Sequence, residues 1–209
     1  MAVSVKRKRS YQTTLRQDQA ELTRQRILAA ARRLLVSGSY SRVTMKEIAR
    51  EAGVAYQTLF SAFGSKVLLA QAMVAAGWPH VEDALKLVAE SRASGDPVRW
   101  LRTTALVNRR INELCGDLVR FMRESGDPDL MSRYRAIELE RYARLEELGL
   151  MLEKRGLIRE NLSRAEAVGI IWAMTGTEQY VQLVLERGWT PDRFEVWLSD
   201  ALANLILAR

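Results

Sequence analysis

Apolar side chains recur at helical spacing in two short runs on either side of a glycine. The first run is Met45, Ile48, Ala49 and Ala52, and the second is Val54, Leu59 and Phe63. Residues three and four apart fall on one face of a helix. Gly53 separates the runs and supplies the positive φ that a sharp turn between helices needs. The pattern predicts two short helices, over about 44–52 and 55–62, joined by a tight turn.

The start of each predicted helix carries its own signal. Thr44 is followed three residues later by Glu47, which is a capping box. Ser65 stands where the N-cap of a further helix is expected. Two short helices around a glycine turn, flanked by basic residues, form the helix-turn-helix motif, which lays its second helix in the major groove of DNA.

The remainder of the chain also shows helical periodicity, interrupted at Gly and Pro. No stretch alternates between apolar and polar residues as a strand would, so the sequence predicts an all-α fold. Further helices are predicted at about 19–37, 65–77, 80–93, 96–114, 117–125, 129–155, 163–187 and 191–207.

Composition favours a folded protein with a core, since 48% of its 209 residues are hydrophobic and 27% are charged. The longest stretch without a charge, residues 67–81, is shorter than the roughly 20 residues needed to span a bilayer. The basic N-terminus leads into polar residues, so no secretory signal is expected. With a single cysteine, Cys115, an internal disulfide is excluded. These features predict a cytoplasmic protein without a membrane partner.

Positive charge is concentrated at one end of the chain. Residues 1–66 contain 13 Lys and Arg against 4 Asp and Glu, a net charge of +9. Residues 67–209 contain 19 against 21, a net charge of −2, which together account for the whole-chain value of +7. A basic segment that includes a helix-turn-helix indicates a nucleic-acid partner.

Signals of enzyme chemistry are missing from the sequence. His80 is the only histidine, Cys115 has no partner constellation, and no Gly-rich loop follows a strand. We therefore expect no catalytic residue, no metal site and no cofactor.

The motif TMKEIAREAGVAYQTLFSAFGSK, at residues 44–66, resembles that of the TetR family of transcriptional repressors. Upstream, RQRILAAARRLLVSG resembles the family's bracing first helix, and downstream RGWTPDRFEVWLSDALANLIL resembles its closing segment. The resemblance implies three parts: a flexible basic arm at 1–18, a helix-turn-helix DNA-binding domain at 19–66, and a ligand-binding and dimerisation domain at 67–209.

The resemblance also implies a set of DNA contacts. The recognition helix maps onto residues 55–63, where side chains off the apolar stripe should face bases, namely Tyr56, Gln57, Thr58 and Ser61. Thr44, Lys46 and Lys66 match positions that reach phosphate or a base. Ala55 and Phe60 also lie in the expected interface, but they replace the family's usual Ser or Thr and Tyr, and Ala62 replaces a usual His or Tyr. The basic run Lys6, Arg7, Lys8 and Arg9 is a candidate substitute for the lost phosphate contacts, unless it is only a solvated tail.

Two further sites are expected in the second half. A pocket between helices should bind a small hydrophobic effector through aromatic and polar residues at helical spacing, which are Trp100, Thr104, Asn108, Phe121, Met122, Tyr134, Glu138, Tyr142, Trp172 and Thr175. Broad apolar faces on the last two helices should form a homodimeric four-helix bundle through Val181, Leu185, Phe194, Trp197, Leu198, Ala201 and Leu205.

These expectations combine into a repressor that is released from a palindromic DNA operator by a small ligand. Two alternatives stay open at this point: a DNA binder that ignores ligands, and a helical ligand-binding protein with weak DNA affinity. They differ in whether an added compound changes operator affinity, and in whether DNA binding depends on sequence.

Overall fold

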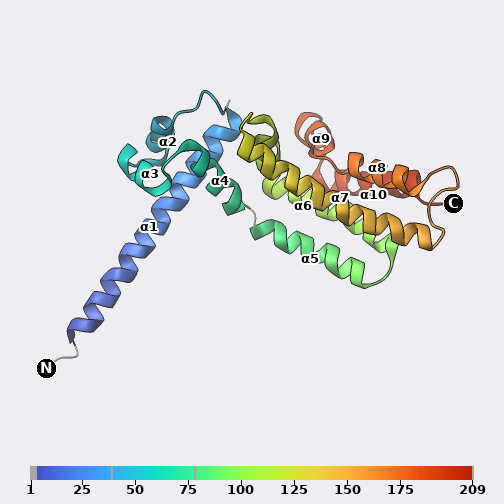
Figure 1. The fold of residues 1–209 in the computed structure, drawn as a ribbon, viewed down its shortest axis with the longest axis horizontal. Helices are drawn as coiled ribbons and strands as arrows, with labels where there is room; N and C mark the ends of the chain where they lie inside the picture. Colours follow the sequence, from blue (N-terminus) through green and yellow to red (C-terminus); the bar gives the residue numbers. More distant parts are fainter. Residues whose placement is uncertain (1–3, 39, 78, 209) are drawn as a thin grey trace. The chain divides into compact units, whose positions relative to one another are not determined.

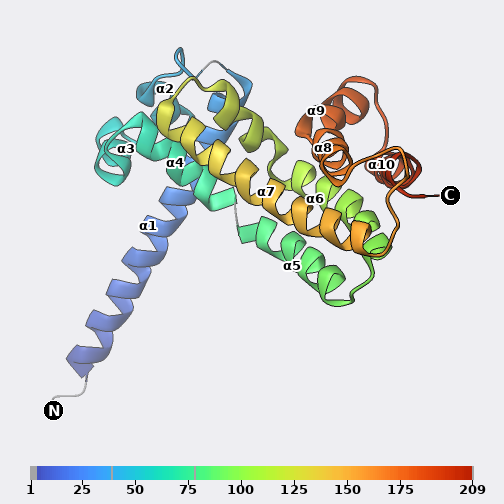
Figure 2. The same cartoon turned by 45° about the vertical axis from the view of Figure 1, so that its right-hand side comes forward.

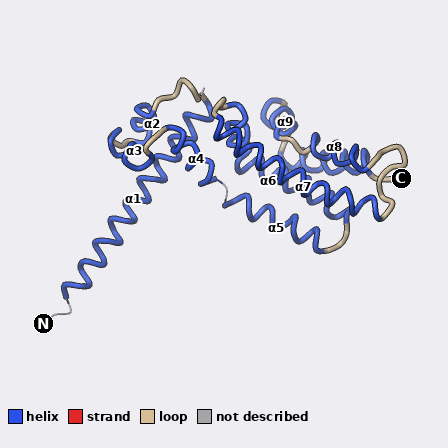
Figure 3. The backbone as a smooth tube through the Cα atoms, viewed as in Figure 1, coloured by secondary structure: helices blue, strands red, loops and turns tan. Residues whose placement is uncertain are grey.

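The computed structural model describes the backbone of residues 4–38, 40–77 and 79–208, and the side chains of these residues except 4–16, 79 and 80. These residues form helices, turns and one isolated β-bridge between Ile158 and Leu207, with no strand among them (Figure 3). The predicted all-α fold is confirmed. The elements are α1 (Ser4–Ser37), α2 (Met45–Ala52), α3 (Tyr56–Phe63), α4 (Lys66–Gly77), α5 (Pro79–Ala93), α6 (Pro97–Glu124), α7 (Pro128–Lys154), α8 (Arg164–Met174), α9 (Thr177–Tyr180), the π-helix η1 (Val181–Glu186) and α10 (Pro191–Ile206).

The chain divides into two compact units, Met1–Ala76 and Gly77–Arg209. The expected domain boundary at residue 66 is therefore corrected to the end of α4. The reason lies in α4 itself, where Leu69, Ala70, Met73 and Val74 are buried, so this helix is part of a core rather than a linker.

In the first unit, α2 and α3 pack on each other and α1 packs on α2. α1 contributes Ile27, Ala31 and Leu35 to the core. Ile48 from α2 and Leu59 from α3 are fully buried as well. The helix-turn-helix is thus held on a small core of its own.

In the arm expected at 1–18, the backbone is helical from Ser4, because α1 is one helix from Ser4 to Ser37. In both views its N-terminal half extends away from α2–α4 (Figures 1 and 2). No Gly or Pro lies between residues 4 and 37, and Lys, Arg, Gln and Leu are good helix formers, so nothing local stops the helix at residue 18. The side chains of Lys6, Arg7, Lys8 and Arg9 lie outside the described residues.

The second unit is built around α6, which packs against α5, α7 and α10, while α8 packs on α7 and α10 (Figure 2). Its core is a cluster of buried apolar residues that includes Trp100, Leu148, Ile171, Phe194 and Leu202. Gly149 allows α7 and α8 to approach closely, since a Cβ there would collide with Val168. α10 is fixed to α6 by Arg109, which forms ion pairs with Asp192 and Glu195.

Two helix boundaries in this unit differ from the predictions. The expected break near residues 115–116 does not exist, because α6 runs through Gly116, whose missing Cβ leaves room for the Asn112 side chain. The single helix expected at 163–187 is broken instead, at Thr175 and Gly176 between α8 and α9.

Among the described residues, no single helix is long and apolar enough to cross a membrane. Only α3 and α4 taken together, with a bend of 72° between them, pass by length and composition.

Candidate nucleic-acid interface and ligand cavities

The turn between α2 and α3 is fixed by local hydrogen bonds. The Thr44 hydroxyl accepts from Glu47 N at 3.2 Å, and Glu47 Oε2 accepts from Thr44 N at 2.8 Å, so the predicted capping box is present. The carboxylate hydrogen-bonded to the backbone N–H and the hydroxyl of Thr44 has its pKa lowered below the usual value. Gly53 ends α2 in the left-handed region with φ of 64°. The sequence signals for this motif therefore act as expected.

The outer face of α3 is the exposed surface of the motif. Leu59 and Phe63 point inward and are buried, whereas Gln57, Thr58 and Ser61 are exposed. Tyr56 is 41% and Phe60 is 45% exposed, and their rings stack with centroids 6.0 Å apart. An amide, a hydroxyl and an aromatic pair on one helix are groups that can bond base edges and contact thymine methyl groups.

The N-terminus of α3 is open. Its N-cap, Ala55, is exposed and offers no side-chain hydrogen bond. The first N–H groups of a helix need an acceptor, and phosphate is well suited to that place because the helix dipole favours negative charge there. With Ala55 as the N-cap, the first backbone N–H groups of α3 have no side-chain acceptor.

Other polar side chains in this unit are engaged inside the protein. Lys66, expected to contact phosphate, donates from Nζ to Tyr40 O at 2.7 Å and to Val43 O at 3.1 Å, and lies over the Tyr40 ring. These two hydrogen bonds use two of its three N–H groups. Arg26 donates to Ala52 O at 2.7 Å and so caps the C-terminus of α2.

Thr44 and Lys46 are exposed at the start of α2.

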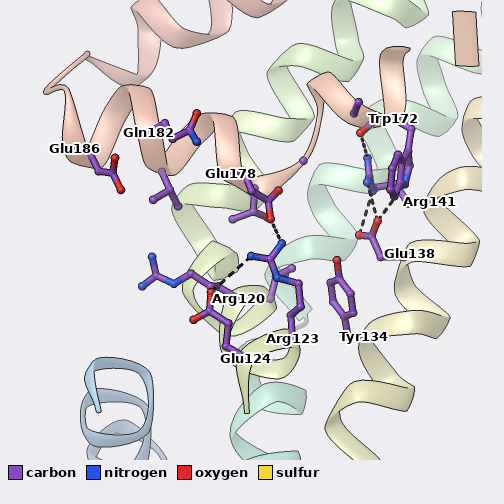
Figure 4. Close-up of a pocket in the computed structure, with 15 residues that line it drawn as sticks. Arg120, Arg123, Glu124, Tyr134, Glu138, Arg141, Trp172, Glu178, Gln182 and Glu186 are labelled. Atoms are coloured by element: carbon purple, nitrogen blue, oxygen red, sulfur yellow. Dashed lines mark hydrogen bonds and ion pairs between the residues drawn. The ribbon is translucent and has the colours of Figure 1, made fainter. Parts of the chain in front are cut away.

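Two neighbouring cavities lie in the second unit. The polar cleft has a volume of about 480 Å³, and its lining includes Arg120, Arg123, Tyr134, Glu138, Arg141 and Trp172 (Figure 4). The apolar chamber has a volume of about 130 Å³, and its wall includes Val81, Leu85, Trp100, Val107, Ile111 and Leu145. Both cavities are bordered by Glu138 and Arg141.

A hydrogen-bonded cluster stands where the two cavities meet. Arg141 forms a bidentate pair with Glu138, at 3.2 Å to Oε1 and 2.7 Å to Oε2. Trp172 Nε1 donates to Glu138 Oε2 at 3.1 Å. Figure 4 shows these three side chains together, apart from the ion pair between Arg123 and Glu178 on the other side of the cleft. Both oxygens of Glu138 are therefore already bonded within the protein.

The break between α8 and α9 is held by side chains from the cavity walls. Asn108 Nδ2 donates to Thr175 O at 2.6 Å, and Arg141 Nη1 donates to Trp172 O at 3.1 Å and to Thr175 Oγ1 at 2.8 Å. A helix end leaves carbonyl groups without intrahelical partners, so these donors stabilise the break. The shape of the C-terminal helices is thereby tied to residues that border the cavities.

Seven of the ten residues predicted for the ligand site line a cavity. Trp100, Thr104, Asn108 and Thr175 line the apolar chamber, Tyr134 and Trp172 line the polar cleft, and Glu138 lines both. Their contact with a ligand stays a prediction.

Three predicted residues, Phe121, Met122 and Tyr142, line neither of these two cavities. Phe121 and Met122 are buried core residues near the end of α6, on the apolar side of that helix. Tyr142 packs edge-on against the Trp172 ring, with the ring centroids 6.4 Å apart.

Sequence reasoning missed Asn112, Arg141 and Arg144. Asn112 could have been found, because it continues the polar series Thr104 and Asn108 at a spacing of four. The arginines gave no signal, since charges on a long helix usually lie on a solvated face.

The predicted dimer face is corrected at two positions. Phe194 and Leu198 are fully buried in the core of the protomer itself, so they cannot face a second copy. Trp197 is partly buried and packs on Trp189 and Phe194. Part of the apolar stripe of α10 packs in the core of the protomer. The sequence pattern alone does not distinguish such core residues from residues that contact a second copy.

Apolar side chains are nevertheless exposed on the last two helical segments. Leu185 is 65% exposed and Leu205 is 42% exposed, while Val181 and Ala201 are partly buried. Val196, which was not predicted, is 61% exposed. These residues are the ones available for contact with a second copy.

The first unit thus contains a helix-turn-helix with an exposed second helix, and the second unit is all-helical and contains two cavities. Residues 27–73 match the family model "Bacterial regulatory proteins, tetR family". This match agrees with the resemblance of the motif to the TetR family of transcriptional regulators.

Solved structures share the fold over nearly the whole chain. NalD, described as the secondary repressor of the MexAB-OprM multidrug efflux pump in Pseudomonas aeruginosa, has a TM-score of 0.66 at 19% identity, covering 91% of this chain and 98% of that one. A putative regulator from Saccharomonospora viridis in complex with choline has 0.68 at 21%, covering 89% and 98%. FadR from Bacillus subtilis in complex with stearoyl-CoA has 0.60 at 17%, covering 87% and 98%. No curated protein sequence matches the chain.

Proposed function

We propose that the chain is a homodimeric repressor that binds a palindromic DNA operator and is released by a small, largely apolar ligand in the apolar chamber. Binding to chromosomal DNA would make it a cytoplasmic protein. The observation that carries the proposal is the outer face of α3, where Tyr56, Gln57, Thr58, Phe60 and Ser61 are all exposed beside an uncapped helix N-terminus.

The dimer follows from the size of the reading surface. One α3 of eight residues reaches only a few base pairs, so useful specificity requires two copies on two half-sites. The exposed Leu185, Val196 and Leu205 supply apolar surface for that pairing.

Release by a ligand would be a shift in population. A ligand that binds only one arrangement of the second unit favours that arrangement, and operator affinity falls if the two α3 helices then miss successive major grooves. The hydrogen bonds of Asn108 and Arg141 to the break between α8 and α9 connect the chamber wall to the C-terminal helices. Complexes of two proteins of this fold with choline and stearoyl-CoA support a ligand-binding role for the chain.

The test is selection of DNA fragments by the full-length protein, followed by titration of the selected operator by fluorescence anisotropy. Gln57→Ala should cost about 1–3 kcal/mol on the operator and relax base preference at one position per half-site. Gln182→Ala, the same change in the other unit, is the matched control. Selection without any consensus sequence would instead favour a helical ligand-binding protein, an alternative supported by the loss of side-chain donors at Phe60 and Ala62.

A further inference from the structure

The apolar chamber contains a cation without a close counter-ion. Arg144, on α7, lines it, and within the described part of the chain no carboxylate lies within ion-pairing distance of its guanidinium. Glu140 and Glu147 attract it only from farther away, and Arg141 repels it. Arg141, one turn earlier, differs because it is held by both oxygens of Glu138.

The partial burial of Arg144 costs free energy because its charge loses hydration. Arg144 is half-buried, and burial lowers the pKa of its guanidinium below the ordinary value. An arginine remains protonated in proteins, so it cannot escape the loss of hydration by becoming neutral. A bound anion would offset that cost through two parallel charge-assisted hydrogen bonds.

The acidic groups of the chamber are less suited to a ligand cation. The two oxygens of Glu138 already accept from Arg141 and Trp172. Glu140 is exposed and therefore hydrated. The charge left without a partner in the chamber wall is positive.

The volume of the chamber limits the apolar part of the ligand. An apolar cavity of roughly 150 Å³ accepts benzene. The chamber, at about 130 Å³, is slightly smaller, and Trp100, Val107 and Ile111 give it an apolar wall. A single aromatic ring, or a branched chain of similar size, fits these limits.

A second polar atom in the chamber wall also has no partner. Asn112 lines the chamber, and its Nδ2 donates to Asn108 O at 2.9 Å, which fixes the orientation of the amide. Its Oδ1 is buried and accepts no hydrogen bond, which costs stability unless a donor reaches it. Arg144 thus needs an acceptor and Asn112 Oδ1 needs a donor, so a carboxylate satisfies only the first of the two.

We propose that the chamber binds a small organic carboxylate, with one ring or an equivalent apolar body among Trp100, Val107 and Ile111 and its carboxylate paired with Arg144. This inference rests on the proposed function, which assigns the chamber as the ligand site. It adds the chemical class of the ligand and the residue that selects it.

The experiment is isothermal titration of the full-length protein with three probes of equal size: benzoate, benzyl alcohol and benzylamine. Benzoate should bind most tightly. Arg144→Gln should weaken benzoate binding by roughly ten- to hundredfold, the loss expected for a charge-assisted hydrogen bond, and leave benzyl alcohol unchanged. Arg144→Lys should recover part of the affinity because it keeps the charge. Arg135→Gln removes an exposed charge from the same helix and should change nothing.

Three results would overturn the inference: equal binding of all three probes, benzoate binding that survives Arg144→Gln, and no benzoate binding at all. The comparison of probes on the unaltered protein does not depend on the variants folding. Operator titration by anisotropy separates this failure from failure of the proposed function. If benzyl alcohol or benzylamine binds in the chamber and releases the operator, the repressor assignment stands and the carboxylate assignment falls.

Discussion

Lys66 should contribute to stability as well as to DNA binding, and Lys66→Met separates the two. The change keeps a long side chain but removes the donors to Tyr40 O and Val43 O and the cation over the Tyr40 ring. The side chain is half-buried, so we take about 1 kcal/mol for each hydrogen bond, at the low end for a charged donor. The ring contact adds about 0.5 kcal/mol, and hydration of the freed carbonyls returns part of the total. The expected loss is about 2 kcal/mol.

Amide hydrogen exchange of peptides from residues 40–66 is the direct assay, because it reports the local free energy of opening. A loss of about 2 kcal/mol corresponds to roughly 30-fold faster exchange. Lys46→Met is the matched control, since Lys46 is exposed on α2. It should leave exchange unchanged while it flattens the salt dependence of operator binding by about 2 units per dimer if it contacts phosphate. Exchange in Lys66→Met at the rate of the unaltered protein would refute the reasoning.

Three more outcomes are expected. Deletion of residues 1–10 should make log K against log salt shallower by roughly 2–4 units per dimer if the basic run meets DNA, and an unchanged slope would make it a passive extension. The double variant Leu185→Glu, Leu205→Glu should sediment as a folded monomer and lose operator binding. The control Leu139→Glu, at an exposed position of α7, should stay dimeric. A double variant that stays dimeric would place the interface elsewhere. The folded-state pKa of Glu47 is lowered, so the stability that its carboxylate contributes is complete above about pH 4.5 and is lost as pH falls through the folded pKa. Glu47→Gln should therefore reduce the loss of thermal stability at acid pH. An identical pH profile of the unfolding temperature would contradict this expectation.

The helix-turn-helix could be predicted from sequence because every signal that defines it is local. Thr44, Glu47 and Gly53 lie within ten residues of one another, and they set the start of α2 and the turn into α3 without help from the rest of the chain. The outward direction of Gln57 and Ser61 follows from the same periodicity that buries Leu59 and Phe63.

The break between α8 and α9 could not be predicted, because its hydrogen bonds come from far along the chain. Asn108 is 67 residues away from Thr175, and Arg141 is 34 residues away. At Gly116 the prediction erred the other way, by ending a helix that continues. A glycine inside a helical pattern suggests a helix end, but here the missing Cβ leaves room for the Asn112 side chain. Arg144 was missed because α7 is rich in charged residues, which suggests a solvated helix, although Arg144 lines the apolar chamber.

Some residues in the wall of the apolar chamber also hold the end of α8, and others do not. This difference affects how the ligand specificity of the proposed site could change during evolution. Asn108 and Arg141 cannot be exchanged freely, because their substitution would also release the carbonyls at the end of α8. Val81, Leu85 and Val88, on α5, border the same space with side chains that can make no hydrogen bond. Substitutions on α5 would therefore change the shape of the chamber without removing a hydrogen bond at the end of α8. Substitutions of Asn108 on α6 or Arg141 on α7 would remove such a bond.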